Sequence, residues 1–296
     1  MKNNLRTSTT YWLVLKFLLI GFFSKAQLFS IQKADSLFEQ KIYTIAATEY
    51  ERCYFFINND SIRFNMVLKR ANCFKANGDY FEAYKNLYRL LDNNLLNDSL
   101  RSVIWYECAF NLYLSKYYND AEKFCLKIAG LPVSTKQSVN ANLLYGLILN
   151  EKNDYLQAGY KFTDYINQAD LTTSKKDSLR KIVAVNYKKE NYPKLKSLKK
   201  ARRLSKVIPG AGLFYAGKPS KALTNISLQL LAVGYTGLNV YVGNYITAAT
   251  AGIHIIRLFY TGGVNQLNEI VPLQNYKRSR KFNDEFKNAF IKELKQ

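Results

Sequence analysis

The chain has few of the residues from which catalytic and metal sites are built. Its 296 residues include one histidine, His254, and four cysteines that form no Cys-x-x-Cys pair. Zinc sites need clusters of such ligands, so the sequence argues against a zinc site. It also shows no nucleophile with a neighbouring base and no paired carboxylates. We therefore expect no enzyme activity and no cofactor.

Acidic residues are missing from a long internal stretch, because none occurs between Asn191 and Asn268. The net charge of +21 is accordingly uneven. Residues 27–173 hold 16 basic and 16 acidic residues, whereas residues 174–296 hold 23 basic and 6 acidic residues, a net charge of +17. This asymmetry predicts two modules, of which the second meets a partner with a negative surface, either phospholipid headgroups or nucleic acid.

A glycine-rich stretch at residues 209–218 lacks the spacing of a nucleotide-binding loop. Gly217 and Lys218 are followed by Pro219 instead of Ser or Thr, and no β-strand pattern precedes the stretch. Both features are needed for a phosphate-binding loop. We therefore expect no nucleotide site there.

What the chain does have is an internal repeat. Four tyrosines, 37, 38 and 37 residues apart, are each followed three residues later by alanine and preceded nine residues earlier by a small residue. In chain order these positions are Ala34, Tyr43 and Ala46; Ala71, Tyr80 and Ala83; Ala109, Tyr118 and Ala121; and Gly146, Tyr155 and Ala158. Such a period predicts a stack of helical hairpins, in which the small residues lie where two helices cross closely.

At these positions the chain resembles the tetratricopeptide-repeat family over about residues 29–168. The usual bulky residue near the start of the first helix appears only as Trp105, and the units are three or four residues longer than the usual 34. The resemblance implies an all-α solenoid of four repeats at residues 27–170 that binds a protein partner. An irregular helical bundle is the alternative, with almost the same core.

The first helices of such an array line its groove. The first helix of the third unit would present one apolar stripe, made of Val103, Tyr106, Phe110, Tyr113 and Leu114. This stripe is our candidate partner-binding groove. The alternative is that the stripe packs against the next hairpin.

The cysteines all fall on apolar faces inside the repeats, at Cys53, Cys73, Cys108 and Cys125. Cys108 and Cys125 belong to the two helices of one hairpin, so an exported protein could join them in a disulfide. Buried free thiols are the reading we favour.

The first 26 residues resemble an export signal. Lys2 and Arg6 precede an apolar run at residues 17–23, and Ser24 and Ala26 supply small residues for cleavage. The signal predicts a protein exported to the bacterial envelope, with repeats that face the periplasm. An uncleaved anchor is the alternative.

A basic connector is expected at residues 171–208, with a helix from Tyr187 to Lys206. Its candidate membrane-surface residues are Lys194, Lys196, Lys199, Lys200, Arg202, Arg203 and Lys206. A basic amphipathic helix suits an anionic lipid surface. Binding of nucleic acid is the alternative, which would show a steep salt dependence.

Two apolar segments follow, at residues 222–243 and 245–264, each near the length of a membrane crossing. The loop before them carries the motif residues Pro209, Gly210, Gly212, Tyr215, Gly217 and Lys218. Over residues 200–275 the chain resembles a bacterial two-helix membrane hairpin domain, although Leu213 replaces its usual polar residue. The resemblance implies membrane residence for residues 209–268. The four-residue spacing of Phe282, Phe286, Phe290 and Leu294 predicts an amphipathic helix at residues 269–296.

The membrane prediction conflicts with the export signal. Both flanks of the hairpin are basic and would lie outside, although basic flanks normally stay in the cytoplasm. Gln229, Asn239, His254 and Arg257 are also costly inside a membrane. Export with shallow insertion is the reading we favour. The predicted function is a membrane-associated, non-enzymatic scaffold at the envelope.

Overall fold

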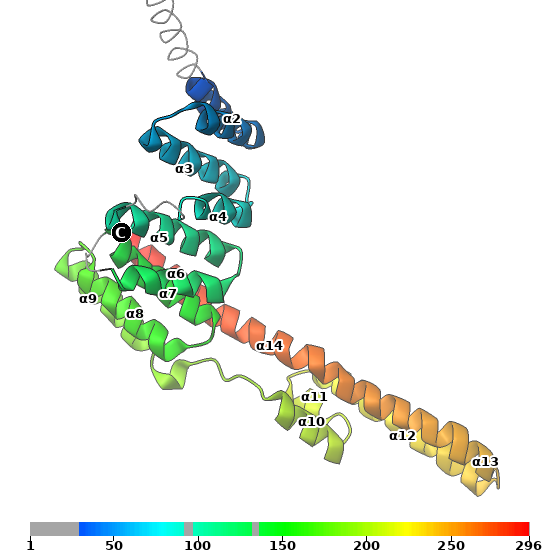
Figure 1. Ribbon diagram of the computed structural model, residues 1–296. Helices are drawn as coiled ribbons and strands as arrows, with labels where there is room; N and C mark the ends of the chain where they lie inside the picture. Colours follow the sequence, from blue (N-terminus) through cyan, green and yellow to red (C-terminus); the bar gives the residue numbers. More distant parts are fainter. Residues whose placement is uncertain (1–29, 92–96, 132–135, 296) are drawn as a thin grey trace, which may run out of the picture. The chain divides into compact units, whose positions relative to one another are not determined.

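The computed structural model describes residues 30–91, 97–131 and 136–295, and the regular secondary structure in these ranges is all helical (Figure 1). The predicted signal peptide at residues 1–26 lies outside the described residues. The chain divides into two compact units, residues 1–171 and 172–296. Each unit is described separately below.

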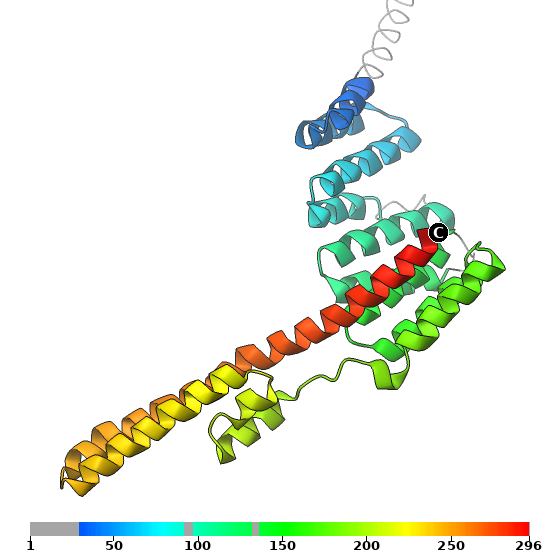
Figure 2. The same ribbon diagram turned by 180° about the vertical axis from the view of Figure 1, so that it is seen from behind.

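The first unit is a row of antiparallel helical pairs (Figures 1 and 2). In chain order it contains a helical segment at residues 30–39, then α2 (Tyr43–Phe56), α3 (Asp60–Ala76), α4 (Tyr80–Tyr88), α5 (Asp98–Leu114), α6 (Tyr118–Ala129), α7 (Lys136–Glu151) and α8 (Tyr155–Gln168). Each of these helices packs against the next, from α2 and α3 through α7 and α8. The predicted all-α fold of consecutive helical hairpins is confirmed.

The turn inside each hairpin has the same backbone geometry. Lys41, Gly78, Lys116 and Asn153 have φ angles of 63°, 84°, 66° and 64° and are spaced by 37, 38 and 37 residues. Each follows its signature small residue by seven positions and precedes its signature tyrosine by two. Left-handed backbone suits Gly and Asn and costs lysine more. The recurrence shows that the sequence period is also a structural period.

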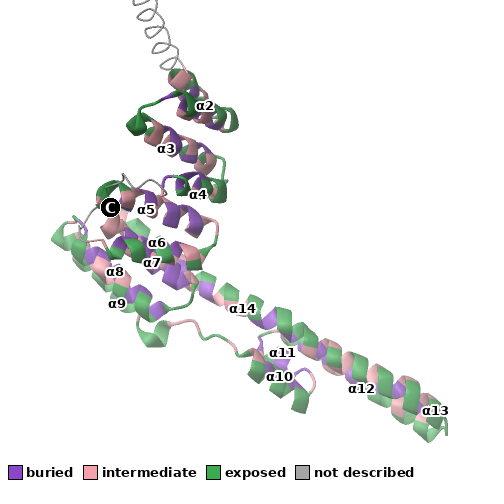
Figure 3. Ribbon diagram, viewed as in Figure 1, coloured by how far each residue is buried: buried purple, intermediate pink, exposed green. Residues whose placement is uncertain are grey.

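The small residues of the repeat lie at the helix crossings. Ala34, Ala46, Ala83, Ala109, Ala121 and Ala158 have no exposed surface, and Ala71 is 2% exposed. A Cβ atom added to Gly146 would lie 2.8 Å from the ring of Phe162, closer than any real contact. Along the helices, buried positions alternate with intermediate and exposed ones (Figure 3). Close approach therefore explains why these positions hold alanine or glycine.

The second unit begins with a pair of helices that are far apart in sequence. It contains α9 (Thr173–Asn186), a 3-10 turn at Lys189–Asn191, α10 (Leu198–Val207), α11 (Ala211–Tyr215), α12 (Pro219–Tyr241), α13 (Tyr245–Thr247), a π-helical turn at Ala248–Gly252, and α14 (Ile253–Lys295). The Tyr187 ring, just after α9, lies edge-on to Phe286 of α14 at 4.9 Å. Near the other end of α9, Lys175 Nζ donates to the Leu294 carbonyl over 3.3 Å. The predicted phenylalanine stripe therefore packs beside α9.

The separate helix expected at residues 269–296 is the continuation of a much longer one. Helix α14 runs for 43 residues and contains Pro272 in its interior. Asn268 and Glu269 lie in the middle of this helix, so the break expected there does not form. The basic helix expected from Tyr187 also starts later, because only Leu198–Val207 is α-helical. Pro193 disfavours helix before it, and residues 193–197 are extended or irregular.

The two apolar segments form a hairpin of α12 against the π-helical turn and the first part of α14. The membrane crossings predicted for them are not supported: nowhere in the described ranges is a helix at once long enough and apolar enough to span a bilayer. Polar side chains account for this. Asn225 and Gln229 lie on the buried face of α12, where Asn225 Nδ2 donates to the Phe259 carbonyl over 3.0 Å and its Oδ1 accepts from Gln229 Nε2 over 3.0 Å.

Candidate protein-binding face and basic surface

The predicted groove residues of α5 form a half-buried stripe. Val103, Tyr106, Phe110, Tyr113 and Leu114 are all of intermediate exposure. The rings of Tyr106 and Phe110 are nearly parallel, with centroids 6.3 Å apart, and burial raises the pKa of Tyr106 to about 12. The three aromatic residues pack against the core of the array. The stripe is thus partly core and partly accessible surface.

The positions equivalent to Phe110 in the first two units are polar. Phe110 directly follows the signature small residue of its unit, and the corresponding residues of the first two units are Asp35 and Asn72. Both line a cavity of about 360 Å³, together with Phe38, Glu39, Tyr50 and Lys69. At this one position the side chain therefore changes from polar in the first two units to aromatic in the third.

Asp35 organises the charged residues around this cavity. Its carboxylate accepts from Lys69 Nζ at 2.6 Å and from the Tyr50 hydroxyl at 2.5 Å. Burial by itself would raise the pKa of Asp35, but the hydrogen bonds from Lys69 and Tyr50 outweigh it and leave that pKa below its ordinary 3.8. Asp35 is therefore anionic at neutral pH and ties the first repeat to the second.

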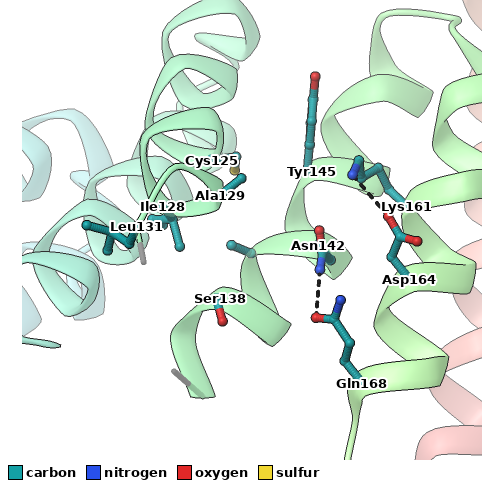
Figure 4. Close-up of a pocket in the computed structure, with 11 residues that line it drawn as sticks. Cys125, Ile128, Ala129, Leu131, Ser138, Asn142, Tyr145, Lys161, Asp164 and Gln168 are labelled. Carbon is teal, nitrogen blue, oxygen red and sulfur yellow. Dashed lines mark hydrogen bonds and ion pairs between the residues drawn. The ribbon is translucent and has the colours of Figure 1, made fainter. Parts of the chain in front are cut away.

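A second cavity, of about 420 Å³, lies between α6, α7 and α8 (Figure 4). On one side Asn142 donates to the Gln168 side-chain carbonyl over 3.1 Å, and Lys161 pairs with Asp164 at 3.0 Å. Cys125 lines the opposite wall, and burial raises the pKa of its thiol to about 12. The cavity thus offers amides, an ion pair and a neutral thiol, a set suited to hydrogen bonding.

The four cysteines are free and buried, at Cys53, Cys73, Cys108 and Cys125. The possible disulfide between Cys108 and Cys125 is not formed. Burial raises the pKa of Cys108 to about 12 and that of Cys73 to about 11. These thiols act as small apolar side chains. Across the described ranges, no group of three or more His, Cys, Asp or Glu side chains is placed to hold a metal ion.

The predicted basic surface is the outer face of α10 and the segment before it. Lys194, Lys199, Lys200, Arg202, Arg203 and Lys206 are exposed, and Lys196 is half-buried. Arg202 bonds through both Nε and Nη2 to Asn268 Oδ1 on α14. Lys196 and Lys200 lie 4.6 and 5.5 Å from the Tyr215 ring. The cations are thereby held together on one surface.

The motif residues of the glycine-rich loop have structural roles. Gly210 and Gly217 have φ angles of 80°, which glycine adopts without strain. Gly212 N donates to Ser205 Oγ, and a Cβ atom at Gly212 would collide with the Ala201 carbonyl. Pro209 precedes this turn and Lys218 ends it, while the Tyr215 hydroxyl accepts from Ser197 N at 3.2 Å. The loop folds α11 into the space between α10, α12 and α14.

Leu213, the departure from the membrane-domain motif, is fully buried with Ala201, Ala216, Ala222 and Leu267. A polar side chain would be unfavourable in that apolar cluster. Sequence reasoning missed this core, and also missed Asn275, which fixes the segment before α10. His254 and Arg257 are both exposed near the start of α14.

Comparisons of this chain with protein-family models, with curated proteins and with solved structures give no match.

Proposed function

We propose that the protein is a non-enzymatic scaffold of the tetratricopeptide-repeat type, which binds an extended segment of a protein partner and is held at a membrane of the bacterial envelope. The observation that carries the proposal is the repetition of one hairpin geometry four times, with the same left-handed turn and the same buried small residues. Stacked hairpins of this kind present long, shallow faces that suit extended partners.

The aromatic stripe of α5 is the proposed anchor of the partner. Tyr106, Phe110 and Tyr113 offer half-buried rings on one face of α5, and buried aromatic anchors dominate protein interfaces. The neighbouring cavity, lined by Glu39 and by the ion pair of Asp35 with Lys69, favours a partner segment that carries a polar or charged group beside its apolar residues.

The test is the replacement of Tyr106 and Tyr113 by alanine. In-cell crosslinking followed by purification should lose the specific partner bands, while circular dichroism shows a folded protein. The control variant replaces Leu126 and Leu156, exposed apolar residues of α6 and α8, by alanine. An unchanged set of partner bands in the folded Tyr106→Ala, Tyr113→Ala variant would refute the binding face.

Membrane association is proposed for the basic surface of α10, with its exposed lysines and arginines. Anionic lipid attracts such a cluster by about 1 kcal/mol for each cation near the surface. Nucleic acid is the second candidate ligand for the same cations. Retention on anionic liposomes and not on DNA-cellulose at moderate salt supports the lipid, and the opposite result supports nucleic acid.

Protease accessibility in intact spheroplasts tests the proposal that the protein is exported and that its repeats face the periplasm. Antibodies against the repeats and against the carboxyl-terminal tail should both report digestion. Protection of the repeats would contradict export and would favour clients inside the cell.

A further inference from the structure

The distal half of the α12–α14 hairpin is an uncharged, exposed and mainly apolar surface, which also includes the exposed polar side chains of Asn244 and His254. No Lys, Arg, Asp or Glu occurs from Ala222 to Ile256. Large side chains gather toward the turn between the two helices, where Tyr241 is 89% exposed and Ile246 is 83% exposed. Leu230, Leu231, Leu238 and Tyr245 are between 66% and 70% exposed. Exposed apolar patches of this kind mark contacts with a membrane or a partner.

The register of the hairpin places Arg257 at the boundary of this surface. A Cβ atom at Gly252 would lie 2.5 Å from Thr236, and a Cβ atom at Gly263 would collide with Asn225. The pairs Gly252–Thr236 and Gly263–Asn225 fit one antiparallel register: moving eleven residues forward along α14 corresponds to moving eleven residues back along α12. Arg257, five residues beyond Gly252, therefore lies level with Leu231, five residues before Thr236. Arg257, the first charged residue of α14 after the turn, thus lies at the level where the exposed apolar section of α12 begins.

The cations of α10 end near the same level. Gly210, four residues after Lys206, packs against Ile226, because a Cβ atom there would lie 2.8 Å from its side chain. Ile226 is five residues before Leu231, about 7.5 Å along the helix. Val207 and Ile208, at the end of α10, are 81% and 60% exposed. The basic surface therefore ends in two exposed apolar residues beside the base of the uncharged section.

The length of the uncharged section matches one leaflet. From Leu230 to Tyr241, where α12 ends, the helix rises about 16 Å, compared with about 15 Å for half of a bilayer's hydrocarbon core. Tyr235, four residues from Leu231 and so near the base of this section, adds a side chain that favours the membrane interface. Apolar residues at the tip and cations at the base are the pattern of a segment that enters a bilayer from one side.

We propose that the tip of the α12–α14 hairpin inserts into one leaflet of an anionic bilayer, with Arg257 and the cations of α10 at the headgroups. This inference rests on the membrane association proposed above and adds the inserting element and its depth. Charge favours lipid over a second copy packed in parallel, which would bring the two basic bases together, whereas a bilayer offers anionic headgroups to the base and hydrocarbon to the tip. An acidic protein would match the cations but would leave the uncharged tip unexplained.

The test uses a fluorescent label that reports on insertion. The native thiols are buried, so Ile246→Cys in the full chain can be labelled selectively at the tip with a nitrobenzoxadiazole dye. Vesicles of phosphatidylcholine with phosphatidylglycerol should shift its emission to the blue and raise it severalfold, and spin-labelled acyl chains should quench it. The same dye at Ser174→Cys, an exposed position on α9, should change little.

Binding and insertion are separated by two variants. Leu238→Gln with Ile246→Gln should reduce co-sedimentation with the vesicles at least tenfold, whereas Leu126→Gln with Leu156→Gln in the array should leave it unchanged. A vesicle-bound protein whose tip label stays unshifted would overturn the insertion and keep the surface association. No co-sedimentation would overturn both. A concentration-dependent dimer that the tip variant abolishes, with no shift in vesicles, would assign the surface to a second copy.

Discussion

The side-chain amide of Asn275 makes both hydrogen bonds that the backbone of Lys196 can offer. Its Oδ1 accepts from Lys196 N at 2.7 Å, and its Nδ2 donates to the Lys196 carbonyl at 2.9 Å. The two residues are 79 positions apart, and residues around Lys196 form no helix of their own. A residue of α14 thus takes the place of a secondary-structure partner for the segment that leads into α10.

Replacement of Asn275 by alanine should loosen this segment. Two backbone hydrogen bonds would be lost, at about 1 kcal/mol each. Amide hydrogen exchange at Lys196 and Ser197 should quicken at least tenfold, while exchange in α5 and α6 stays constant. Asn275→Asp keeps the acceptor and loses the donor, so its exchange rate at Lys196 should lie between those of the unaltered protein and of the alanine variant. Unchanged exchange at Lys196 in the alanine variant would contradict the role of Asn275.

Two adjacent glycines of α14 should respond in opposite directions to alanine. A Cβ atom at Gly263 would displace Asn225 and break its bond to Phe259, whereas a Cβ atom at Gly262 would meet nothing within 4 Å. Gly263→Ala should therefore destabilise the hairpin by about 1–3 kcal/mol. Gly262→Ala should be neutral or stabilising by up to about 1 kcal/mol, because alanine favours helix. Limited proteolysis of the hairpin in urea measures the stability of both variants. Equal effects of the two substitutions would contradict the close packing of Asn225 against Gly263.

A matched pair of glycines tests the helix crossings of the array. Gly146→Ala places a methyl group against the Phe162 ring, which is fully buried and cannot turn aside freely. We expect a loss of about 1–3 kcal/mol, seen as an earlier loss of Trp105 fluorescence in urea. Gly130→Ala, whose Cβ atom would have ordinary contacts of 3.6 Å, should be close to neutral. A tolerated Gly146→Ala would show that the crossing has room to spare.

The buried thiols predict how stability depends on alkaline pH. Folding raises the pKa of Cys108 and of Cys125 from 9.0 to about 12, so the unfolded chain releases these protons first. Their contribution to stability is complete below pH 9 and is lost as the pH rises toward 12. Urea unfolding of the Cys108→Ser variant should show a shallower decline over this interval. At pH 8, the native thiols should react with a disulfide reagent only as fast as the array opens.

The sequence by itself determined the first unit. Spacing alone predicted the hairpin period. A helix crossing leaves room only for a small side chain, and every hairpin has such a crossing, so a small residue recurs at the same position of each unit. The burial of Ala34, Ala83 and Ala158 and the shared turn at Lys41, Lys116 and Asn153 follow from that local rule. Whether the stripe on α5 is core or surface did not follow, since aromatic residues at helical spacing serve both purposes.

Only the tertiary structure decided the organisation of the second unit. Hydropathy suggested two membrane crossings and a separate final helix, yet Asn225 of α12 packs against Gly263 and donates to the Phe259 carbonyl across a hairpin, and α14 continues through Pro272. The glycine-rich motif, which sequence alone could assign only by resemblance, is explained by left-handed backbone and by close packing against α10. The physical reason is distance along the chain: the partners of Lys196, Gly263 and Tyr187 are set by long-range packing, which no local pattern encodes.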